Sequence, residues 1–284
     1  MLKIRKLEFS YPKTGTKAVK GIDFEISKGE VFGFLGPSGA GKTTTQRIII
    51  GLLRGYSGSV EVLGKERRKW GKDFFEQIGV AFDFPNLYQK LTAAENLKLI
   101  GAYYENGTSD IDSLLDRVGL LPDRDKKVEG FSKGMKMRLN FIRAIMHDPE
   151  LLFLDEPTSG LDPVNAKIIK DIILDLKGRG KTIFLTTHNM TVAEQLCDRI
   201  AFIVDGKIPI IDNPKELMVK QGKKRVKVEY YDTEGCKASE FDLNGLKENS
   251  SFFELLKSCE IKTIHSQEAT LEDIFIRMTG RELM

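Results

Sequence analysis

The sequence predicts an α/β protein built on a parallel β-sheet that helices bury on both faces. Three short, nearly continuous apolar runs predict strands, at Leu151–Leu154, Thr182–Thr186 and Ile200–Val204. Helical periodicity separates them, as over Val164–Leu176, and strands that alternate with helices are typical of a parallel sheet. A glycine-rich octapeptide between another apolar run and a helical run supports the same fold class.

The N-terminal segment predicts an antiparallel layer. Residues 2–32 read as short alternating strands, separated by turns at 13–17 and 27–30. The first residues, Met1–Leu7, alternate apolar and basic side chains as an edge strand does, and they lack the apolar core of a signal peptide. We therefore expect the chain to stay in the cytosol.

The octapeptide at residues 36–43 predicts a loop that binds phosphate. It lies between the strand 31–35 and a helix that continues through Thr44, and it consists of Gly36, Pro37, Ser38, Gly39, Ala40, Gly41, Lys42 and Thr43. Glycines let consecutive backbone N–H groups close on a phosphate, and the positive end of the helix points at the same charge. Lys42 would reach the terminal phosphates, and the Thr43 hydroxyl would bind magnesium. We expect the chain to bind a nucleoside triphosphate through these eight residues and Thr44.

The middle of the chain predicts a helical insertion. Residues 92–147 read as helices only, and the breaks fall at Gly107, 119–122 and 129–130. The economical interpretation is a helical subdomain, at about residues 84–148, inserted between two strands of the central sheet.

The C-terminal part predicts a second, smaller unit. The nucleotide-binding domain ends near Asn213-Pro214, which gives it residues 1–214. Residues 215–284 then read as a small α/β appendage, with a strand at Arg225–Tyr231 and helices at Phe252–Leu256 and Leu271–Met278.

Two adjacent carboxylates end one of the predicted strands. Asp155 and Glu156 follow the apolar run 151–154, at the carboxyl edge of the sheet, where ligand chemistry takes place in such folds. Asp155 would hold magnesium, and Glu156 would orient and polarise an attacking water as a general base. The structural alternative makes them the cap and the first-turn acid of a helix.

Composition excludes several classes of protein. Charged residues make up 30% of the 284 residues and the formal net charge is only +3, so a nucleic-acid-binding tail is not indicated. No run approaches the ~18 apolar residues that a membrane span requires. We expect that the chain does not cross a bilayer alone.

Three further motifs show more specifically which family of nucleotide-binding proteins the chain resembles. Phe131–Met135, Ser159–Asp162 and Thr187-His188 accompany the phosphate loop and the paired acids in a fixed order. With them, the chain resembles the ATP-binding subunits of ABC transporters over roughly residues 1–214. The resemblance implies a P-loop ATPase core that carries an antiparallel layer and a helical subdomain.

The pentapeptide 131–135 is similar to the family's signature motif, usually Leu-Ser-Gly-Gly-Gln, which contacts ATP bound by the opposite subunit. Ser132, Lys133 and Gly134 match its core, although Lys133 replaces a glycine and Met135 replaces the glutamine. This variant resembles exporter-type members. Alone, the stretch is also a routine helix cap, with Ser132 as a good N-cap residue.

Other site residues follow from the resemblance. His188 resembles the switch histidine that hydrogen-bonds the γ-phosphate, which a neutral imidazole can do while its other nitrogen accepts. Tyr11 looks like the aromatic residue that stacks on adenine, although a core tyrosine would fit as well. Asp162 belongs to a stretch similar to the D-loop, which touches the opposite subunit, and it is also a plain N-cap before Pro163.

The clearest departure from the family lies at Asp83. Aligning residues 78–88 with the family's strand and loop places Asp83 where most members have the glutamine of the Q-loop. That glutamine usually touches magnesium and the attacking water. An aspartate can still ligate magnesium but adds a charge beside Asp155 and Glu156. The alternative is that Asp83 caps the loop and Gln89 substitutes for the glutamine.

The resemblance implies an ATPase that binds ATP and Mg²⁺ and works as a dimer with a second ATP-binding subunit. A separate transmembrane permease would supply the channel, with this chain peripheral on the cytoplasmic face of the membrane and no nucleic acid bound. Residues 270–280 resemble the tail of drug-exporting members, which favours export. Two alternatives stay open: a soluble ABC ATPase acting on ribosomes or DNA, and a regulatory subunit that binds ATP without turnover.

Overall fold

A computed structural model describes residues 1–221, 225–233, 235–267 and 270–280. The described residues divide into two compact units between Asp212 and Asn213. The larger unit holds two β-sheets and a group of helices, and the smaller unit holds one β-sheet and its helices.

The central sheet of the larger unit has the strand order β10-β9-β3-β8-β7-β6. Its strands are β3 (Val31–Leu35), β6 (Ile78–Ala81), β7 (Leu151–Asp155), β8 (Thr182–Thr187), β9 (Arg199–Val204) and β10 (Lys207–Asp212). All pairings except β10 with β9 are parallel. Leu35 pairs with Thr187 and Asp155 with Thr186, so the carboxyl ends of β3, β7 and β8 meet at one edge. The α/β fold class is confirmed.

Helices cover both faces of this sheet. They are α1 (Lys42–Ile49), α6 (Pro163–Gly178) and α7 (Met190–Leu196), with the short α2 (Phe74–Gln77) and the 3-10 turn η1 (Arg67–Lys69) before β6. Phe32 and Phe34 of β3 face a core that includes Ile48 of α1. Gly33 points the other way, where an added Cβ would lie 2.7 Å from Cys197 Sγ at the end of α7.

The predicted antiparallel layer is a second sheet in the order β2-β1-β4-β5. It consists of β1 (Leu2–Ser10), β2 (Lys17–Ile26), β4 (Ser57–Val62) and β5 (Lys65–Glu66). Aromatic rings join the two sheets: Phe24 of β2 stacks on Phe32 at 5.6 Å and on Phe34 at 5.5 Å. Each such pair contributes roughly 0.5–1.5 kcal/mol beyond the burial of its area. The second sheet therefore holds the face of β3 that carries Phe32 and Phe34, just before the phosphate loop.

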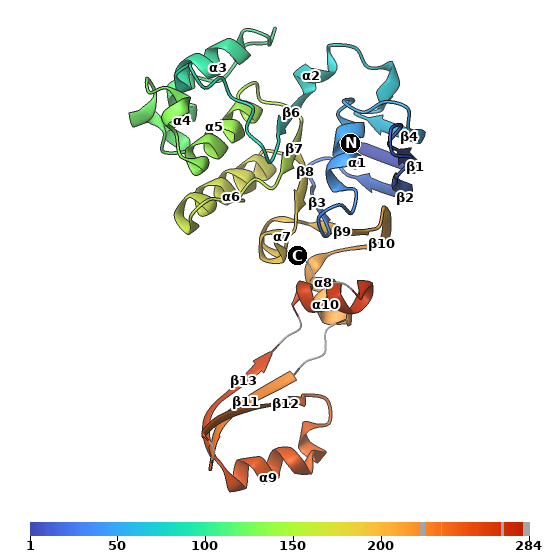
Figure 1. Cartoon of the computed structure of the whole chain (residues 1–284), viewed down its shortest axis with the longest axis vertical. Helices are drawn as coiled ribbons and strands as arrows, with labels where there is room; N and C mark the ends of the chain where they lie inside the picture. Colours follow the sequence, from blue (N-terminus) through green and yellow to red (C-terminus); the bar gives the residue numbers. More distant parts are fainter. Residues whose placement is uncertain (222–224, 234, 268–269, 281–284) are drawn as a thin grey trace. The chain divides into compact units, whose positions relative to one another are not determined.

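The segment between β6 and β7 is helical, as predicted. It contains α3 (Ala93–Gly101), α4 (Ile111–Arg117) and α5 (Lys133–Ile145), with 3-10 turns η2 (Leu121–Asp123) and η3 (Val128–Gly130). Figure 1 shows these helices grouped to one side of the central strands, away from β1, β2 and β4. Buried Asn140 of α5 donates to the Phe82 carbonyl at 2.8 Å, which ties this group to the end of β6.

The smaller unit contains the three-stranded antiparallel sheet β12-β11-β13. Its elements are α8 (Pro214–Gln221), β11 (Arg225–Asp232), β12 (Gly235–Asp242), η4 (Leu246–Glu248), α9 (Ser250–Ser258), β13 (Glu260–Gln267) and α10 (Leu271–Thr279). Val226, Val228 and Phe252 form its core, so α9 covers one face of the sheet.

No helix in the described part of the chain is long and apolar enough to cross a membrane.

Candidate active site

The loop between β3 and α1 needs glycine at several positions. Gly39 and Gly41 have φ values of +77° and +112°, which side-chain-bearing residues rarely adopt. A Cβ added at Gly36 would lie 2.1 Å from the Ile203 carbonyl oxygen. The loop thus lies directly against β9, and its backbone amides precede the N-terminus of α1. Such a loop and helix end favour an anion.

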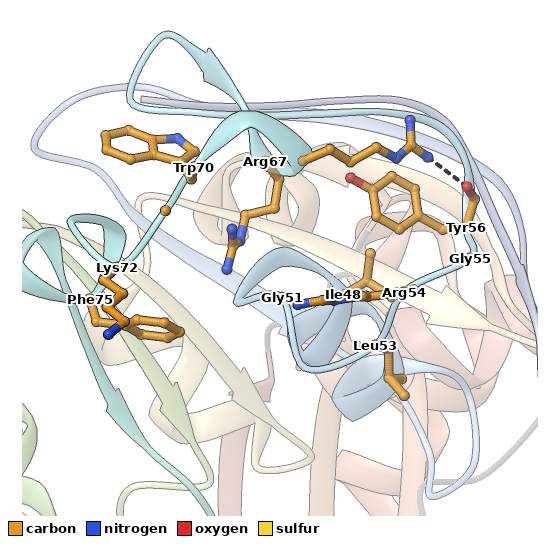
Figure 2. Close-up of a pocket in the computed structure, with 12 residues that line it drawn as sticks. Ile48, Gly51, Leu53, Arg54, Gly55, Tyr56, Arg67, Trp70, Lys72 and Phe75 are labelled. Atoms are coloured by element: carbon orange, nitrogen blue, oxygen red, sulfur yellow. Dashed lines mark hydrogen bonds between the residues drawn. The ribbon is translucent and has the colours of Figure 1, made fainter.

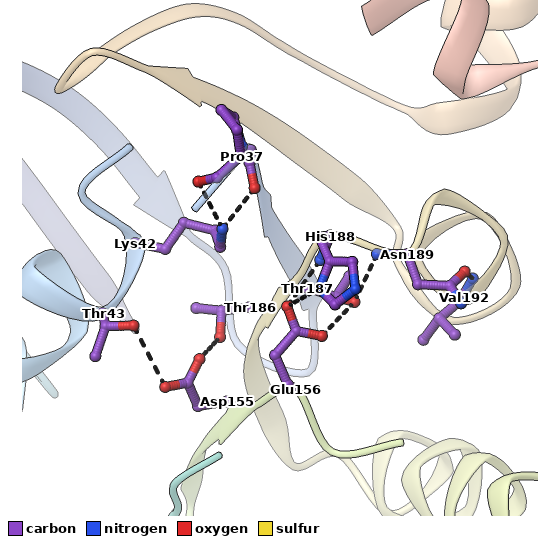
Figure 3. A network of polar contacts seen from close by, with 11 residues as sticks. Pro37, Lys42, Thr43, Asp155, Glu156, Thr186, Thr187, His188, Asn189 and Val192 are labelled. Atoms are coloured by element: carbon purple, nitrogen blue, oxygen red, sulfur yellow. Dashed lines mark hydrogen bonds and ion pairs between the residues drawn. The ribbon is translucent and has the colours of Figure 1, made fainter. Parts of the chain in front are cut away.

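Lys42 lies inside this loop. Its Nζ donates to the carbonyl oxygens of Gly36 and Pro37, the latter at 3.0 Å (Figure 3). Burial lowers the pKa of Lys42, and the negative charges of Glu156 and Asp155 act in the opposite direction. The ammonium group is therefore held in place by carbonyl dipoles, in a partly buried position where an additional anion would be bound strongly.

Thr43 and Asp155 face each other across the sheet edge. The Thr43 Oγ1 donates to Asp155 Oδ2 at 3.5 Å, and the buried Thr186 hydroxyl donates to Asp155 Oδ1 (Figure 3). Among the described residues no group of three or more His, Cys, Asp or Glu could hold a metal. Mg²⁺ bound with a nucleotide takes few protein ligands and completes its shell with phosphates and water, so one hydroxyl and one carboxylate fit it.

Asp155 is 5% exposed, and its charge is poorly solvated. Burial raises the pKa of Asp155 above its ordinary value, and the charges of Asp83 and Glu156 raise it further, while the Thr186 hydrogen bond and Lys42 lower it. The ionised carboxylate is the form that a cation would stabilise.

Replacing Asp155 with asparagine is expected to raise the thermal unfolding midpoint of the nucleotide-free protein at neutral pH by a few degrees. Because the folded pKa is raised, the contribution of Asp155 to stability is full below the unfolded pKa of ~3.9 and is lost as pH rises through the folded pKa. Asparagine has no proton to lose, so the variant does not lose this stability as pH rises. Unfolding midpoints measured from about pH 4 to about pH 7 should show a gain that grows with pH. An equal gain at every pH would show that the buried charge of Asp155 is not the cause.

Glu156 follows Asp155 in a strained conformation. Its φ of +49° lies in the left-handed region, which costs a non-glycine residue roughly 1–2 kcal/mol. Its carboxylate accepts hydrogen bonds from the Thr187 hydroxyl at 3.1 Å, the His188 backbone N–H at 2.9 Å and His188 Nδ1 at 2.7 Å. Backbone strain that surrounding bonds maintain is concentrated at functional sites.

The contact with Glu156 fixes the tautomer of His188. An ionised carboxylate only accepts, so Nδ1 carries the proton in this arrangement. A neutral His188 would then present an unprotonated Nε2. To donate to a phosphate through a ring nitrogen, the histidine must be protonated or must turn away from Glu156. The His188 side chain is 61% exposed, which leaves room for the second option.

One cavity brings these groups together. It has a volume of roughly 310 Å³ and is lined by Ser38, Gly39, Gly41, Lys42, Thr43, Thr44, Asp83, Asp155, Glu156, Ser159 and His188. Asp83 lines this cavity together with Asp155, whereas the Gln89 amide donates to the Leu87 carbonyl at 3.1 Å and does not line the cavity. The phosphate loop, both acids and the histidine therefore line one cavity, and their roles in it stay predictions.

The signature residues Ser132, Lys133 and Gly134 do not line this cavity. The Ser132 hydroxyl accepts from Met135 N–H at 3.2 Å, so it caps α5. Asp162 likewise caps α6, accepting from Val164 and Asn165 N–H at 3.0 Å each. The two motifs are neighbours, since a Cβ added at Gly160 would lie 3.0 Å from Lys133 Cε. Ser159 lines the cavity, and the other residues of the two motifs lie outside it within one chain.

Tyr11 lies beside the phosphate loop but outside the cavity. Its ring packs edge-on against Phe9 with centroids 5.1 Å apart, and its hydroxyl lies 2.9 Å from Thr44 Oγ1. It is partly buried against the core cluster and does not line the cavity. The hydroxyl contact places it beside the phosphate loop, so stacking on a base stays a prediction.

Sequence reasoning missed several polar partners. Thr186 and Thr187 hold Asp155 and Glu156, and their position at the end of a predicted strand beside His188 was an available signal. Asn140 and Arg143 of α5 hold the backbone of the Asp83 loop: Arg143 donates to the Asn86 carbonyl at 2.5 Å. These two residues read only as part of an amphipathic helix, so no local pattern identified them.

Comparison with known proteins agrees with this geometry. Residues 19–159 match the family described as ABC transporter, and residues 224–268 match the fluoroquinolone efflux ABC transporter C-terminal domain. The chain is 52% identical, over all of its length and 94% of the relative's, to a fluoroquinolones export ATP-binding protein of Mycobacterium tuberculosis (strain H37Rv). This chain belongs to the ABC transporter ATP-binding subunits. It is also 35% identical to a bacitracin transport ATP-binding protein of Bacillus licheniformis, over 93% of each chain.

Solved structures of ABC subunits share the fold. An ATP-binding subunit of an ABC transporter matches with a TM-score of 0.71 and 27% identity over 78% of this chain and 93% of that one. A dimeric ATP-binding cassette in a post-hydrolysis state, bound to ADP and Pi, matches with a TM-score of 0.68 and 26% identity over 75% and 98%. This ABC subunit is therefore an ATP-binding ATPase with a transport role, and an ATPase acting on ribosomes or DNA is not favoured.

Proposed function

We propose that this ABC subunit powers the export of a small drug-like molecule through a separate permease. The 52% identity to the mycobacterial fluoroquinolone export protein over the whole chain supports export of a related aromatic compound. The match of residues 224–268 to the C-terminal domain of fluoroquinolone efflux transporters supports it from the smaller unit.

The observation that carries the ATPase mechanism is the cavity where Lys42, Glu156 and His188 meet. Lys42 and the loop amides bind the β- and γ-phosphates and neutralise the charge that develops on transfer. Glu156 orients the water that attacks the γ-phosphorus and accepts its proton, and the bond to ADP breaks. His188 lines the cavity with a largely exposed side chain. Once the imidazole turns away from Glu156, it contacts the γ-phosphate.

Thr43 and Asp155 are the residues that would hold Mg²⁺, with Asp83 as a third oxygen donor facing them. The ion would neutralise part of the charge on the phosphates. Asp155 suits this role because Thr186 fixes its buried carboxylate, and the raised pKa shows that the nearby Lys42 does not fully compensate its charge.

A second ATP-binding subunit would complete the site. Ser132 and Gly134 lie at the start of α5, a 13-residue helix whose N-terminal amides can bind a phosphate. Because they do not line the cavity of their own chain, we assign them to ATP held by the opposite subunit, with Lys133 adding a cation and Asp162 on the same surface. ATP would then join two subunits.

The permease would dock beside the Asp83 loop. A second cavity of roughly 510 Å³ is lined by Leu52, Phe84 and Asn86 and also by Thr43, Asp83 and Asp155. Leu52 is 58% exposed and Phe84 is 76% exposed, which is typical of an apolar contact surface. A partner seated there would sense changes at the nucleotide through Asp83.

Purification from detergent-solubilised membranes tests the proposal. A tagged chain should retain a companion with several membrane spans, and cells that overproduce both should accumulate less fluoroquinolone than cells carrying Glu156→Gln. Recovery with ribosomes or nucleic acid in place of a membrane protein, or unchanged drug accumulation, would contradict it.

Replacing Asp83 with alanine is expected to raise the magnesium concentration needed for half-maximal ATPase activity, because it removes one oxygen that faces Asp155. Asp83→Gln is the matched control: its amide oxygen retains a ligand, and substantial activity should survive. The measurement is the initial rate against magnesium at saturating ATP. An unchanged requirement in Asp83→Ala would remove Asp83 from the metal site.

A further inference from the structure

A basic pocket lies on the larger unit outside the nucleotide site. It has a volume of roughly 660 Å³, and its lining comes from the end of α1 with the segment that follows it, and from the segment between β5 and α2 with the start of α2 (Figure 2). We call this the basic pocket, defined by the cations Arg54, Arg67, Arg68 and Lys72 with the rings of Tyr56, Trp70 and Phe75. Pockets of this size hold small ligands.

The charge of the basic pocket is unbalanced. Among the described residues that line it, none is Asp or Glu. The nearby carboxylate of Glu66 is engaged by the Tyr56 hydroxyl at 3.1 Å and by Arg68 at 3.9 Å. Arg54 and Lys72 are exposed and have no ion pair with any described residue. A cleft lined by charges of one sign raises the local concentration of ions of the opposite sign, here anions.

The other two guanidinium groups are fixed in place. Arg67 donates to the Ile49 and Ile50 carbonyls at 3.1 and 2.9 Å, lies 3.9 Å from the Phe74 ring centre, and in Figure 2 points toward Gly51. Arg68 donates to the Tyr56 carbonyl at 2.6 Å and lies 4.0 Å from its ring centre. Backbone carbonyl oxygens and aromatic rings therefore hold the two guanidinium groups in place before a ligand binds. This lowers the entropic cost of binding.

Gly51 leaves the space that the Arg67 guanidinium occupies. It has a φ of +86°, and a Cβ added there would lie 2.0 Å from Arg67 Nη2, so only glycine lets that guanidinium lie against the end of α1. Burial lowers the pKa of Arg67 most, and the neighbouring charge of Arg54 acts in the same direction while Tyr56 opposes it. Arg54 and Arg67 line the same pocket, and an anion bound between two like charges would stabilise both.

We propose that the basic pocket binds a phosphate group of an anionic ligand, with Arg54 and Lys72 as the free cations and Arg67 as the preset guanidinium. Arginine forks match the tetrahedral oxygens of phosphate, and lysine adds a point charge. The phosphate can belong to a soluble phosphorylated metabolite or to the headgroup of an anionic phospholipid. The aromatic rings would contact the organic part of either.

The test uses the full chain saturated with ADP and magnesium, so that the phosphate loop is already occupied. Calorimetric titration with glycerol phosphate reports the soluble source, and co-sedimentation with phosphatidylglycerol vesicles, against phosphatidylcholine vesicles, reports the lipid source. Arg54→Gln and Lys72→Gln should each weaken binding about tenfold, because each removes one charge-assisted contact. Arg54→Lys should fall between wild type and Arg54→Gln.

Lys98→Gln is the matched control, since Lys98 is an exposed lysine of α3 outside the pocket and its loss changes net charge equally. Its binding should equal wild type, and all variants should keep the wild-type ATPase rate and melting temperature. Glycerol phosphate binding alone would support the soluble source, and vesicle binding would support the lipid. Binding of neither probe, or equal weakening in Lys98→Gln, would overturn the proposal.

Discussion

Replacing Glu156 with glutamine is expected to lower ATP hydrolysis by roughly 10²–10⁴-fold, the contribution typical of a positioned general base. The amide keeps the size of the side chain: its oxygen can still accept from the His188 backbone N–H, and its NH2 group can donate to the Thr187 hydroxyl. It cannot accept a proton from water. ATP binding should survive, because the loop and Lys42 are unchanged.

The measurement is the steady-state rate of phosphate release beside the equilibrium binding of ATP. Glu194→Gln is the matched control, since it makes the same exchange at an exposed residue of α7 that does not line the cavity. A Glu156→Gln rate equal to the wild-type rate would show that another group takes the proton.

Replacing Lys42 with alanine is expected to weaken nucleotide binding roughly 10–100-fold, the loss of one or two charge-assisted hydrogen bonds to phosphate. Ser132→Arg should leave the affinity of the isolated subunit unchanged and still abolish ATPase activity. The reason is that Lys42 lines the cavity of its own chain and Ser132 does not.

Fluorescent-nucleotide titration at subunit concentrations low enough to prevent association separates these effects. Loss of the Ser132 cap costs about 1 kcal/mol of stability, so the melting temperature of Ser132→Arg must be recorded beside its affinity. Equal loss of binding in both variants would contradict a site shared between subunits.

Much of the fold could be predicted because its signals are local. The apolar runs at 151–154 and 182–186 are short and continuous, as buried parallel strands require, and they became β7 and β8. Lys42, Glu156 and His188 could be placed together because each follows a strand whose carboxyl end meets the same edge.

What could not be predicted depends on contacts between distant segments. Asn140 bonds to the Phe82 backbone across 58 residues, and nothing in the helix α5 pattern identifies that partner. The bond from His188 Nδ1 to Glu156 also depends on the left-handed φ of Glu156, a conformation that tertiary packing imposes on a non-glycine residue. The basic pocket joins residues on both sides of β4, so its charges looked dispersed in the sequence.

Sedimentation velocity of the Glu156→Gln variant tests the central claim most directly, which is that ATP closes two of these subunits on each other. With ATP and magnesium the variant should sediment as a dimer, since nucleotide bound by each loop meets the Ser132–Gly134 surface of the opposite subunit. With ADP in place of ATP it should sediment as a monomer. A monomer under both conditions, or a dimer that forms equally with ADP, would contradict the account.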